Sequence, residues 1–405
     1  AQNDPMRPMV FLLLTGIALA VTATARADDF SLHGYADFRI VSPDQDEKGW
    51  LDGGLGLFRY GASQPDPNFR FAEAFAEARL NFDDGFHVVA SVRADPKTRS
   101  GVDALEAYVS YTPSSDGDWR WSAKAGAFFP PFSLENTDIG WTSPYTLTPS
   151  AIDSWIGDEL RTIGSEANVA YQTGFGSISL TAAAFGYNDP AGVLIADRGW
   201  SLDDRPTGLF EKVRIPDATV LLFGGTPPGR TPLFWEIDNR VGWYAGLGAS
   251  FRGIGKLSVY RYDNEADPFK DYDEVYAWHT RFWSAGWETH AGAFSILAQA
   301  MRGDTVIFTF RTNFSSAYAL VAYDIDADWR IAARAETFRT DAGYDSPMSE
   351  HGGALTAALT WMPRDWLRLT GEGIWQSSVH EERFEEGIGA QQSGTQFQLS
   401  ARFSI

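Results

Sequence analysis

The chain alternates apolar and polar residues over many short segments, and this period of two predicts β-strands with one apolar face and one polar face. Residues 395–405 read T-Q-F-Q-L-S-A-R-F-S-I, and the alternation continues to the last residue. Residues 71–82 and 366–376 repeat it. Such strands suit a membrane barrel, with lipid on one face and water on the other. A single strand of this kind would also fit a soluble sandwich.

Reading the alternation between turn-forming residues predicts about 16 strands. The predicted strands are residues 30–42, 69–83, 86–95, 102–112, 119–128, 163–174, 176–187, 240–253, 255–264, 274–284, 286–300, 313–324, 328–340, 351–362, 366–380 and 393–405. The count is even, as a bacterial barrel requires. Because sequence alone defines strand boundaries poorly, totals of 14 or 18 strands also fit.

The connections between these strands alternate between short and long, which indicates that both chain ends face the same side of the membrane. Tight turns rich in Gly, Pro and Asp are expected at 83–85, 113–118, 174–176, 253–255, 285–286, 324–328 and 363–365. Between them fall outer loops, of which 43–68, 129–162 and 188–239 are long. We therefore expect a 16-stranded antiparallel transmembrane β-barrel, an all-β fold.

The first 27 residues have the features of a secretory signal peptide. Arg7 precedes the apolar run 10–21, and Ala25-Arg26-Ala27 offers small residues at both positions that a signal peptidase reads. We expect cleavage there, which leaves residues 28–405 as one barrel domain. An exported strand-rich chain of this kind points to the bacterial outer membrane. Past this segment there is no apolar run of about 18 residues, which argues against helical membrane spans.

Composition narrows the possible partners. The 28 Phe, 15 Tyr and 15 Trp suit aromatic girdles at the two membrane interfaces. A net charge of −20 argues against nucleic acid as a partner, because phosphate binding needs a basic surface. The absence of cysteine excludes a disulfide scaffold. Much of the acidic charge falls in predicted loops, such as 263–274, where solvated surface is the ordinary interpretation.

The third outer loop, residues 129–162, is far longer than an ordinary connection and rich in apolar residues. Phe132, Trp141, Trp155, Ile156 and Leu160 offer enough apolar surface to pack against something, which argues against disorder. A barrel of 16 strands has a lumen too wide for its own side chains to fill. We therefore expect this loop to fold into the lumen and narrow it.

The segment G-A-F-F-P-P-F-S-L-E, residues 126–135, resembles the G-x-F-x-x-P-F-x-L-E pattern of the phosphate-selective group of Gram-negative porins. The matching residues are Gly126, Phe128, Pro131, Phe132, Leu134 and Glu135. The resemblance implies a passive diffusion channel and a third loop opposite a basic wall, and porins of this kind are often homotrimers. This chain departs from the pattern because the loop after Lys124 lacks lysine, which argues against strong anion selectivity.

Alternation and the resemblance together give the candidate pore residues. The expected constriction residues are Glu135, Asp138, Asp153, Asp158, Glu159 and Arg161, and the expected pore-wall residues are Arg39, Arg79, Arg93, Lys124 and Arg334. Alternation also places Arg281 on the inner face. A negative loop facing the arginines of the first strands would create a transverse field. We expect a weakly cation-preferring pore for small hydrophilic solutes or ions. The competing interpretation is that these charges pair with one another and only hold the loop in place.

Other functions find less support in the sequence. The six histidines lack the spacing of known metal motifs, and no G-x-S-x-G motif indicates a hydrolase, so we expect no enzyme, metal or cofactor. A siderophore transporter with a plug domain would need about 22 strands and a longer chain. The remaining alternative is a non-conducting outer-membrane barrel that acts in adhesion or as a structural protein. Lipid and small polar solutes are the expected partners.

Overall fold

The computed structural model describes residues 29–61, 65–96, 101–115, 117–222, 224, 229–343 and 346–405. The predicted signal peptide, residues 1–27, lies outside the described residues. In the part of the chain that is described, no helix combines the length and apolar character that a membrane crossing would need.

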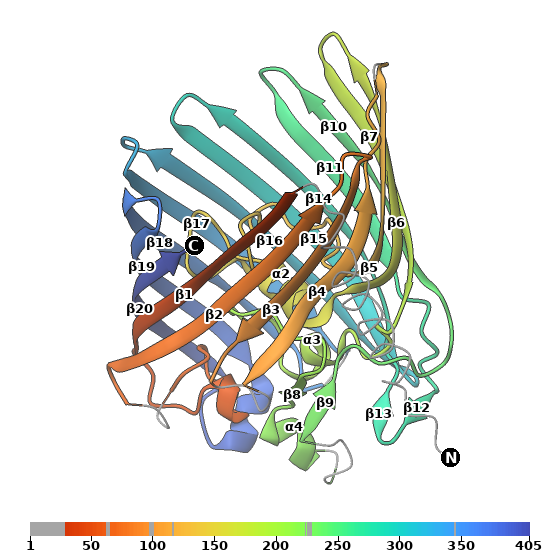
Figure 1. The fold of residues 1–405 in the computed structure, drawn as a ribbon. Coiled ribbons are helices and arrows are strands. Elements are labelled where there is room, and N and C mark those ends of the chain that lie inside the picture. The colour runs from red at the N-terminus through yellow and green to blue at the C-terminus, as the bar shows by residue number, and fades with distance from the viewer. Residues whose placement is uncertain are drawn as a thin grey trace.

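Sixteen antiparallel strands close into one barrel, as the sequence predicts (Figure 1). They are β1 (Asp29–Pro43), β2 (Asn68–Asn81), β3 (Phe86–Ala94), β4 (Val102–Tyr111), β5 (Trp119–Phe128), β6 (Thr162–Thr173), β7 (Gly176–Gly186), β10 (Gly242–Phe251), β11 (Gly255–Asp263), β14 (His279–Ala291), β15 (Phe294–Ile307), β16 (Phe310–Asp324), β17 (Trp329–Asp341), β18 (Glu350–Arg364), β19 (Leu367–His380) and β20 (Gln391–Ser404). The first and last strands pair along a seam that runs from Tyr35 opposite Ser404 to Pro43 opposite Gln396.

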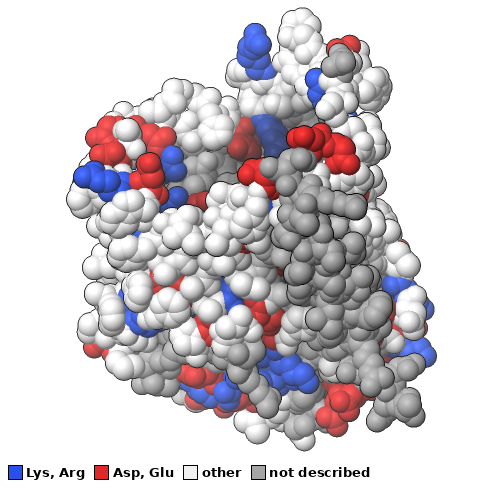
Figure 2. All heavy atoms as spheres, viewed as in Figure 1, with Lys and Arg blue, Asp and Glu red and all other residues white. Residues whose placement is uncertain are grey.

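Apolar and polar residues alternate between the outside and the inside of the barrel wall. In β19, Trp375 is exposed on the outer face, whereas Thr370, Glu372 and Gln376 are buried on the inner face. Charged side chains on the face shown in Figure 2 gather mainly toward the two ends of the barrel. This distribution suits a wall that meets hydrocarbon along its middle and water at its ends.

The smaller elements lie at the end of the barrel that carries the long loops, which is the lower end in Figure 1, or inside the barrel. Loop 1 (residues 44–67) contains η1 (Trp50–Asp52), and loop 3 (residues 129–161) contains α2 (Ala151–Glu159). Loop 4 (residues 187–241) carries α3 (Val193–Asp197), β8 (Lys212–Arg214), α4 (Asp217–Leu222) and β9 (Arg230–Pro232). Beyond them lie the hairpin β12 (Asp271–Tyr272) and β13 (Val275–Tyr276), and η2 (Glu381–Glu386) in loop 8 (residues 381–390).

Two details of the predicted strand layout are wrong. The expected turn at Ala285-Gly286 lies in the middle of β14, and the chain turns instead between β14 and β15, where Gly292 has a φ of 63°. Gly286 serves a different purpose, because a Cβ there would stand 2.6 Å from the Leu134 side chain of loop 3. The predicted strands also left residues 301–312 as a connection. In the structure, β15 continues to Ile307 and β16 begins at Phe310, so the connecting turn is only residues 308–309.

Arg281 was expected on the inner face by alternation, and the structure places it on the outer face. Its neighbour Phe282 is fully buried and stacks on Tyr262 with the ring centroids 4.8 Å apart inside the barrel. On β14, Phe282 therefore faces the lumen and its neighbour Arg281 cannot. Arg281 turns outward near the rim and pairs with Asp304 at 3.1 Å.

Candidate functional site

Loop 3 folds into the barrel, as the sequence predicts, and brings α2 against the inner wall (Figure 1). Ser150 caps the start of the helix, because its hydroxyl accepts a hydrogen bond from the Asp153 backbone N–H at 3.2 Å. All nine helical residues are buried. Trp155 contacts two wall aromatics, with its ring centroid 5.4 Å from Phe282 and 5.1 Å from Phe314. Apolar packing therefore holds the helix inside.

The motif segment before the helix anchors loop 3 at a second place. Phe132 is surrounded by four aromatic rings of the wall at centroid distances of 5.1 to 6.0 Å, contributed by Tyr244, Tyr260, Tyr262 and Phe282. Its carbonyl accepts a 2.6 Å hydrogen bond from Gln299. Such clusters contribute stability beyond the apolar area they bury. Phe132 of the motif segment thus acts here as a packing residue.

Glu135 lies at the centre of a buried ionic network between loop 3 and β17. Arg334 donates to Glu135 at 2.7 Å and to Glu336 at 2.9 Å, and none of these three side chains is exposed to solvent. Glu135 also accepts from the Ser150 backbone N–H at 2.9 Å, and Glu336 accepts from that of Ala151 at 2.7 Å. The network satisfies backbone donors at the start of α2, which a buried helix end requires.

Three further predicted constriction carboxylates, all in α2, are also buried. Asp153 lies in the first turn of α2, where burial and the neighbouring Glu135 raise its pKa to about 7. Asp158 pairs with Arg198 of loop 4 at 2.8 Å. Glu159 accepts hydrogen bonds from the backbone N–H groups of Gly192, Leu194 and Ile195, and burial raises its pKa to about 7.

Arg161 and Asp138 complete the predicted constriction set. Arg161 is buried, donates to the backbone carbonyls of Leu160 at 2.7 Å and Thr207 at 2.6 Å, and lies over the Phe129 ring. Asp138 differs, because its side chain keeps 28% exposure while pairing with Arg368 of β19 at 2.9 Å. Among the six predicted constriction residues, Asp138 is therefore the most exposed.

Loop 4 supplies a second ionic anchor, which the sequence analysis did not identify. Asp204 contacts three arginines: Arg39 of β1, Arg59 of loop 1 at 2.7 Å, and Arg70 of β2 at 3.4 Å. Burial alone would raise the pKa of Asp204, but these arginines outweigh it and hold the pKa well below its usual range. The only available signal was the charged run Asp203-Asp204-Arg205 in a long loop.

The predicted pore-wall residues divide into buried and accessible groups. Arg39, Arg93 and Arg334 are buried, and Arg93 donates to the Pro206 carbonyl of loop 4. Arg79 remains 46% exposed beside Glu77, and Lys124 remains 25% exposed, 3.2 Å from Glu166. The buried arginines hold loops 3 and 4 to the wall. Arg79 and Lys124 are the accessible residues of this set.

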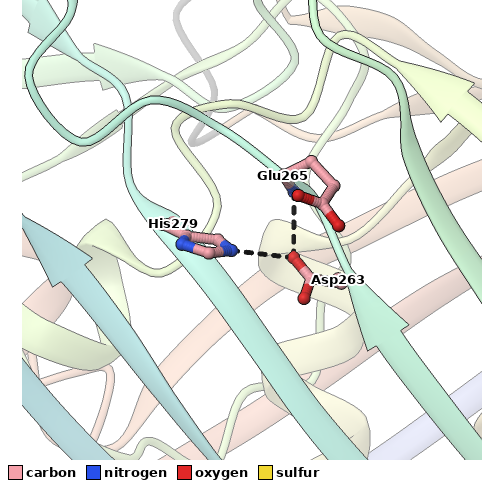
Figure 3. Close-up of side chains that lie close together, drawn as sticks. All are labelled: Asp263, Glu265 and His279. Atoms are coloured by element: carbon pink, nitrogen blue, oxygen red, sulfur yellow. Dashed lines mark hydrogen bonds and ion pairs between the residues drawn. The ribbon is translucent and has the colours of Figure 1, made fainter.

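One cluster of possible metal ligands lies near the rim at the long-loop end (Figure 3). His279 donates through Nε2 to the Asp263 carboxylate at 2.9 Å, and this carboxylate also accepts from the Glu265 backbone N–H at 3.0 Å. Cations already surround it, since Arg261 lies 3.7 Å from Asp263 and Arg281 is its partner across the strand pair. The geometry is that of an ion-paired rim.

No protein-family model matches the sequence, and no curated protein matches it. Solved structures do resemble the fold. OmpF of Salmonella typhi, in complex with daunomycin, has 11% identity and a TM-score of 0.56, covering 94% of this chain and 99% of that chain.

The outer membrane channel DcaP of Acinetobacter baumannii has 12% identity and a TM-score of 0.54 over 93% of this chain and 97% of that one. A trimer form of OmpT, an outer membrane protein of Vibrio cholerae, has 11% identity and a TM-score of 0.53 over 93% and 99%. At such identities the likeness establishes a porin-like barrel fold.

Proposed function

We propose that this porin-like barrel is a passive diffusion channel for small hydrophilic solutes or ions across the bacterial outer membrane. The observation that carries the proposal is the combination of a closed 16-stranded barrel, an apolar outer face, and a third loop folded inside. A closed barrel satisfies every backbone group of the wall in lipid, and an inward loop narrows the lumen.

Accessible lumen charges of both signs favour solutes that are small and hydrated. Arg79 and Lys124 retain exposure on one part of the wall, and the ion pair of Asp138 with Arg368 retains exposure on another. Fixed charges of opposite sign in a confined aqueous space orient dipoles and still pass ions. We assign Asp138 as the loop 3 carboxylate beside the solute path. Glu135, Asp153, Asp158, Glu159 and Arg161 shape the aperture by holding the loop.

The test is single-channel conductance and reversal potential in a planar bilayer under a KCl gradient. We expect stable conductance steps and a reversal potential shifted weakly toward that of potassium. Asp138→Asn should move the reversal potential toward that of chloride, because Arg368 then loses its partner. The matched control is Asp341→Asn, a half-exposed carboxylate that pairs with Arg339 at 3.3 Å at the end of β17. A control that shifts the potential equally would contradict the assignment of Asp138.

The motif resemblance suggests phosphate as a solute, and the same bilayer tests it. Replacing KCl by potassium phosphate should leave the weak cation preference in place, because the buried arginines are already paired with carboxylates. A reversal potential close to that of phosphate would instead favour a phosphate-selective pore.

One observation favours the alternative of a non-conducting barrel in adhesion or structure. Residues of loops 1, 3 and 4 form a continuous buried cluster with the wall, including Phe58, Trp155 and Trp200. A correctly folded protein with no conductance steps would establish this alternative and remove the channel proposal.

We further propose that three copies assemble in the outer membrane, because a similar fold occurs in a trimer form in the OmpT protein of Vibrio cholerae. Light scattering of the detergent-solubilised protein, corrected for bound detergent, should give three times the mass of the chain. A monomer mass under several mild detergents would contradict it.

A further inference from the structure

A polar cavity of about 150 Å³ lies between loop 1, loop 4 and the end of α2. Its walls include Trp50 of η1, Asp158 of α2, Arg198 just after α3, and Asp203 of loop 4. Eight of the thirteen lining residues are charged, four acidic and four arginine, so the lining carries no formal net charge. Residues of α3 and β8 line the cavity. Figure 1 shows β8 at the long-loop end of the barrel, with α3 above it.

The acidic side of the cavity lacks a full complement of partners. Asp203 is 3% exposed, and its Oδ1 accepts no hydrogen bond from any residue in the described ranges. Its nearest cation is Arg59, at 3.8 Å, and Arg59 is already hydrogen-bonded to Asp204 at 2.7 Å. Burial and the nearby Asp158 raise the pKa of Asp203 well above its usual range. A positively charged group in the cavity would stabilise both carboxylates.

The basic side of the cavity has a hydrogen-bond donor without an acceptor. Arg198 donates through Nη2 to Asp158 at 2.8 Å and to Ser201 at 2.6 Å, and its guanidinium lies 4.7 Å from the Trp50 ring centroid. Its buried Nε finds no acceptor among the described residues. Arg214 lines the same cavity with its side chain 35% exposed, and its Nη2 donates to Asp217 at 2.9 Å. An anionic group would find here the unused Nε–H of Arg198 and the accessible guanidinium of Arg214.

We propose that this cavity binds a small zwitterionic solute, with an ammonium group at Asp203 and Asp158 and a carboxylate group at Arg198 and Arg214. An α-amino acid with a short side chain has this chemistry. The inference rests on the proposed function in one respect, because it makes the cavity a solute site on the way into the channel. The binding itself needs only the residues described.

Size and charge together favour a small ligand with both charges. A volume of about 150 Å³ has room for the charged groups of a small amino acid. A simple inorganic anion would leave the Asp203 Oδ1 unpaired, and a simple cation would leave the Arg198 Nε unpaired. Only a ligand with both charges satisfies both sides.

The test is isothermal titration calorimetry of the refolded full-length barrel with three compounds. L-Alanine carries both charges, ethylamine carries only the positive charge, and propionate carries only the negative charge. We expect alanine to bind at least about tenfold more tightly than either fragment. Asp203→Asn should weaken alanine binding by at least about tenfold. Asp341→Asn, at the end of β17 and outside the cavity, is the matched control and should leave the affinity unchanged.

If Asp203→Asn fails to fold, Arg214→Gln provides the same test at a half-exposed position and should also weaken alanine binding. No heat with alanine, equal affinity for a fragment, or an unchanged affinity in the variants would overturn the proposal. Conductance of the same preparation separates the two proposals. Conductance without alanine binding removes only this inference, whereas alanine binding without conductance removes only the channel function.

Discussion

At the scale of single residues, the lumen contains charges that are buried and paired. Arg334 is the clearest case, because it holds Glu135 of loop 3 and Glu336 of its own strand at once, with full burial of all three. Charged groups out of water are costly unless every partner is in place. The stability of such a group therefore depends on its neighbours, and removing one partner leaves a buried charge without compensation.

Arg334→Met should lower the free energy of unfolding by about 3–5 kcal/mol, because Glu135 and Glu336 would remain buried without their cation. Unfolding by urea in lipid vesicles measures this loss. The control is Arg339→Met in the same strand, where the exposed pair with Asp341 contributes at most about 1 kcal/mol. Equal losses in the two variants would show that burial of the network is unimportant.

Glu159 makes the attachment of loop 3 to loop 4 depend on pH. Its pKa rises from 4.5 to about 7 on folding because burial disfavours the carboxylate. The folded state thus binds more protons between these two values, and stability falls as pH rises through that window. The resulting loss in the free energy of unfolding is on the order of 3 kcal/mol. Asp158 and Arg198, which face Glu159, act in opposite directions on it.

We therefore expect the thermal midpoint of the wild type to be higher at pH 5.5 than at pH 8. In Glu159→Gln the difference between the two pH values should shrink. Glu381→Gln, at an exposed position of η2, should leave the pH dependence as it is. A wild type that is more stable at pH 8 would contradict the sign of this prediction.

At the scale of elements, α2 is held mainly by aromatic packing, and the ionic network fixes where it starts. Trp155 inserts between Phe282 and Phe314 of the wall and also meets Trp200 of loop 4. Removing a large aromatic side chain from such a cluster costs about 3–5 kcal/mol. Loop 3 and loop 4 share this contact, so its loss should loosen both.

Trp155→Ala should expose Arg161, the only basic residue of loop 3, to trypsin. Cleavage after Arg161, detected by mass spectrometry, should be much faster than in the wild type, where that side chain is 1% exposed. Trp375→Ala, on the outer face of β19, is the matched control and should leave the cleavage rate unchanged. Equal resistance of both variants would show that the ionic network alone holds the loop.

Elements also show how far the sequence could predict this molecule. Strand positions and the inward loop 3 followed from alternation and from an apolar loop too long for a simple connection. The Asp204 anchor could not be predicted, because residues 187–241 show no regular alternation that would indicate which side chains contact the wall.

Gly286 was misread as a turn residue, because its actual neighbour, Leu134, is distant in the sequence. Phe282 and Trp283 are adjacent and both aromatic, so alternation could not decide which of them faces the lumen, and Arg281 was misplaced as a result.

At the scale of the whole molecule, the barrel depends on one contact between the ends of its sheet. β1 pairs with β20 with Ile40 opposite Leu399, and both side chains face outward. A shift of one residue along this seam would exchange the lipid and lumen faces of a whole strand. The register of the seam is therefore decisive for closure.

The chain has no cysteine, so a pair of introduced cysteines reports this register directly. Ile40→Cys with Leu399→Cys should form a disulfide readily in the folded barrel, because directly opposed residues have suitable Cα distances. Ile40→Cys with Phe397→Cys, displaced by two residues, should form it poorly. Non-reducing electrophoresis compares the two, and in urea both pairs should oxidise at similar rates. Equal yields in the folded state would contradict the register.

The interior contacts of the seam have a consequence for how the barrel is assembled. Asp37 of β1 accepts from Ser400 at 2.6 Å and from Arg402 at 3.4 Å, both on β20, and Arg402 also donates to Thr142 of loop 3 at 3.1 Å. A slip by two residues would keep every side chain on its proper face and still separate these partners. Loop 3 thus favours the correct register of the seam from inside the barrel. In a misaligned barrel, Asp37 and Arg402 would lose each other as partners, and loop 3 would lose its contact with Arg402.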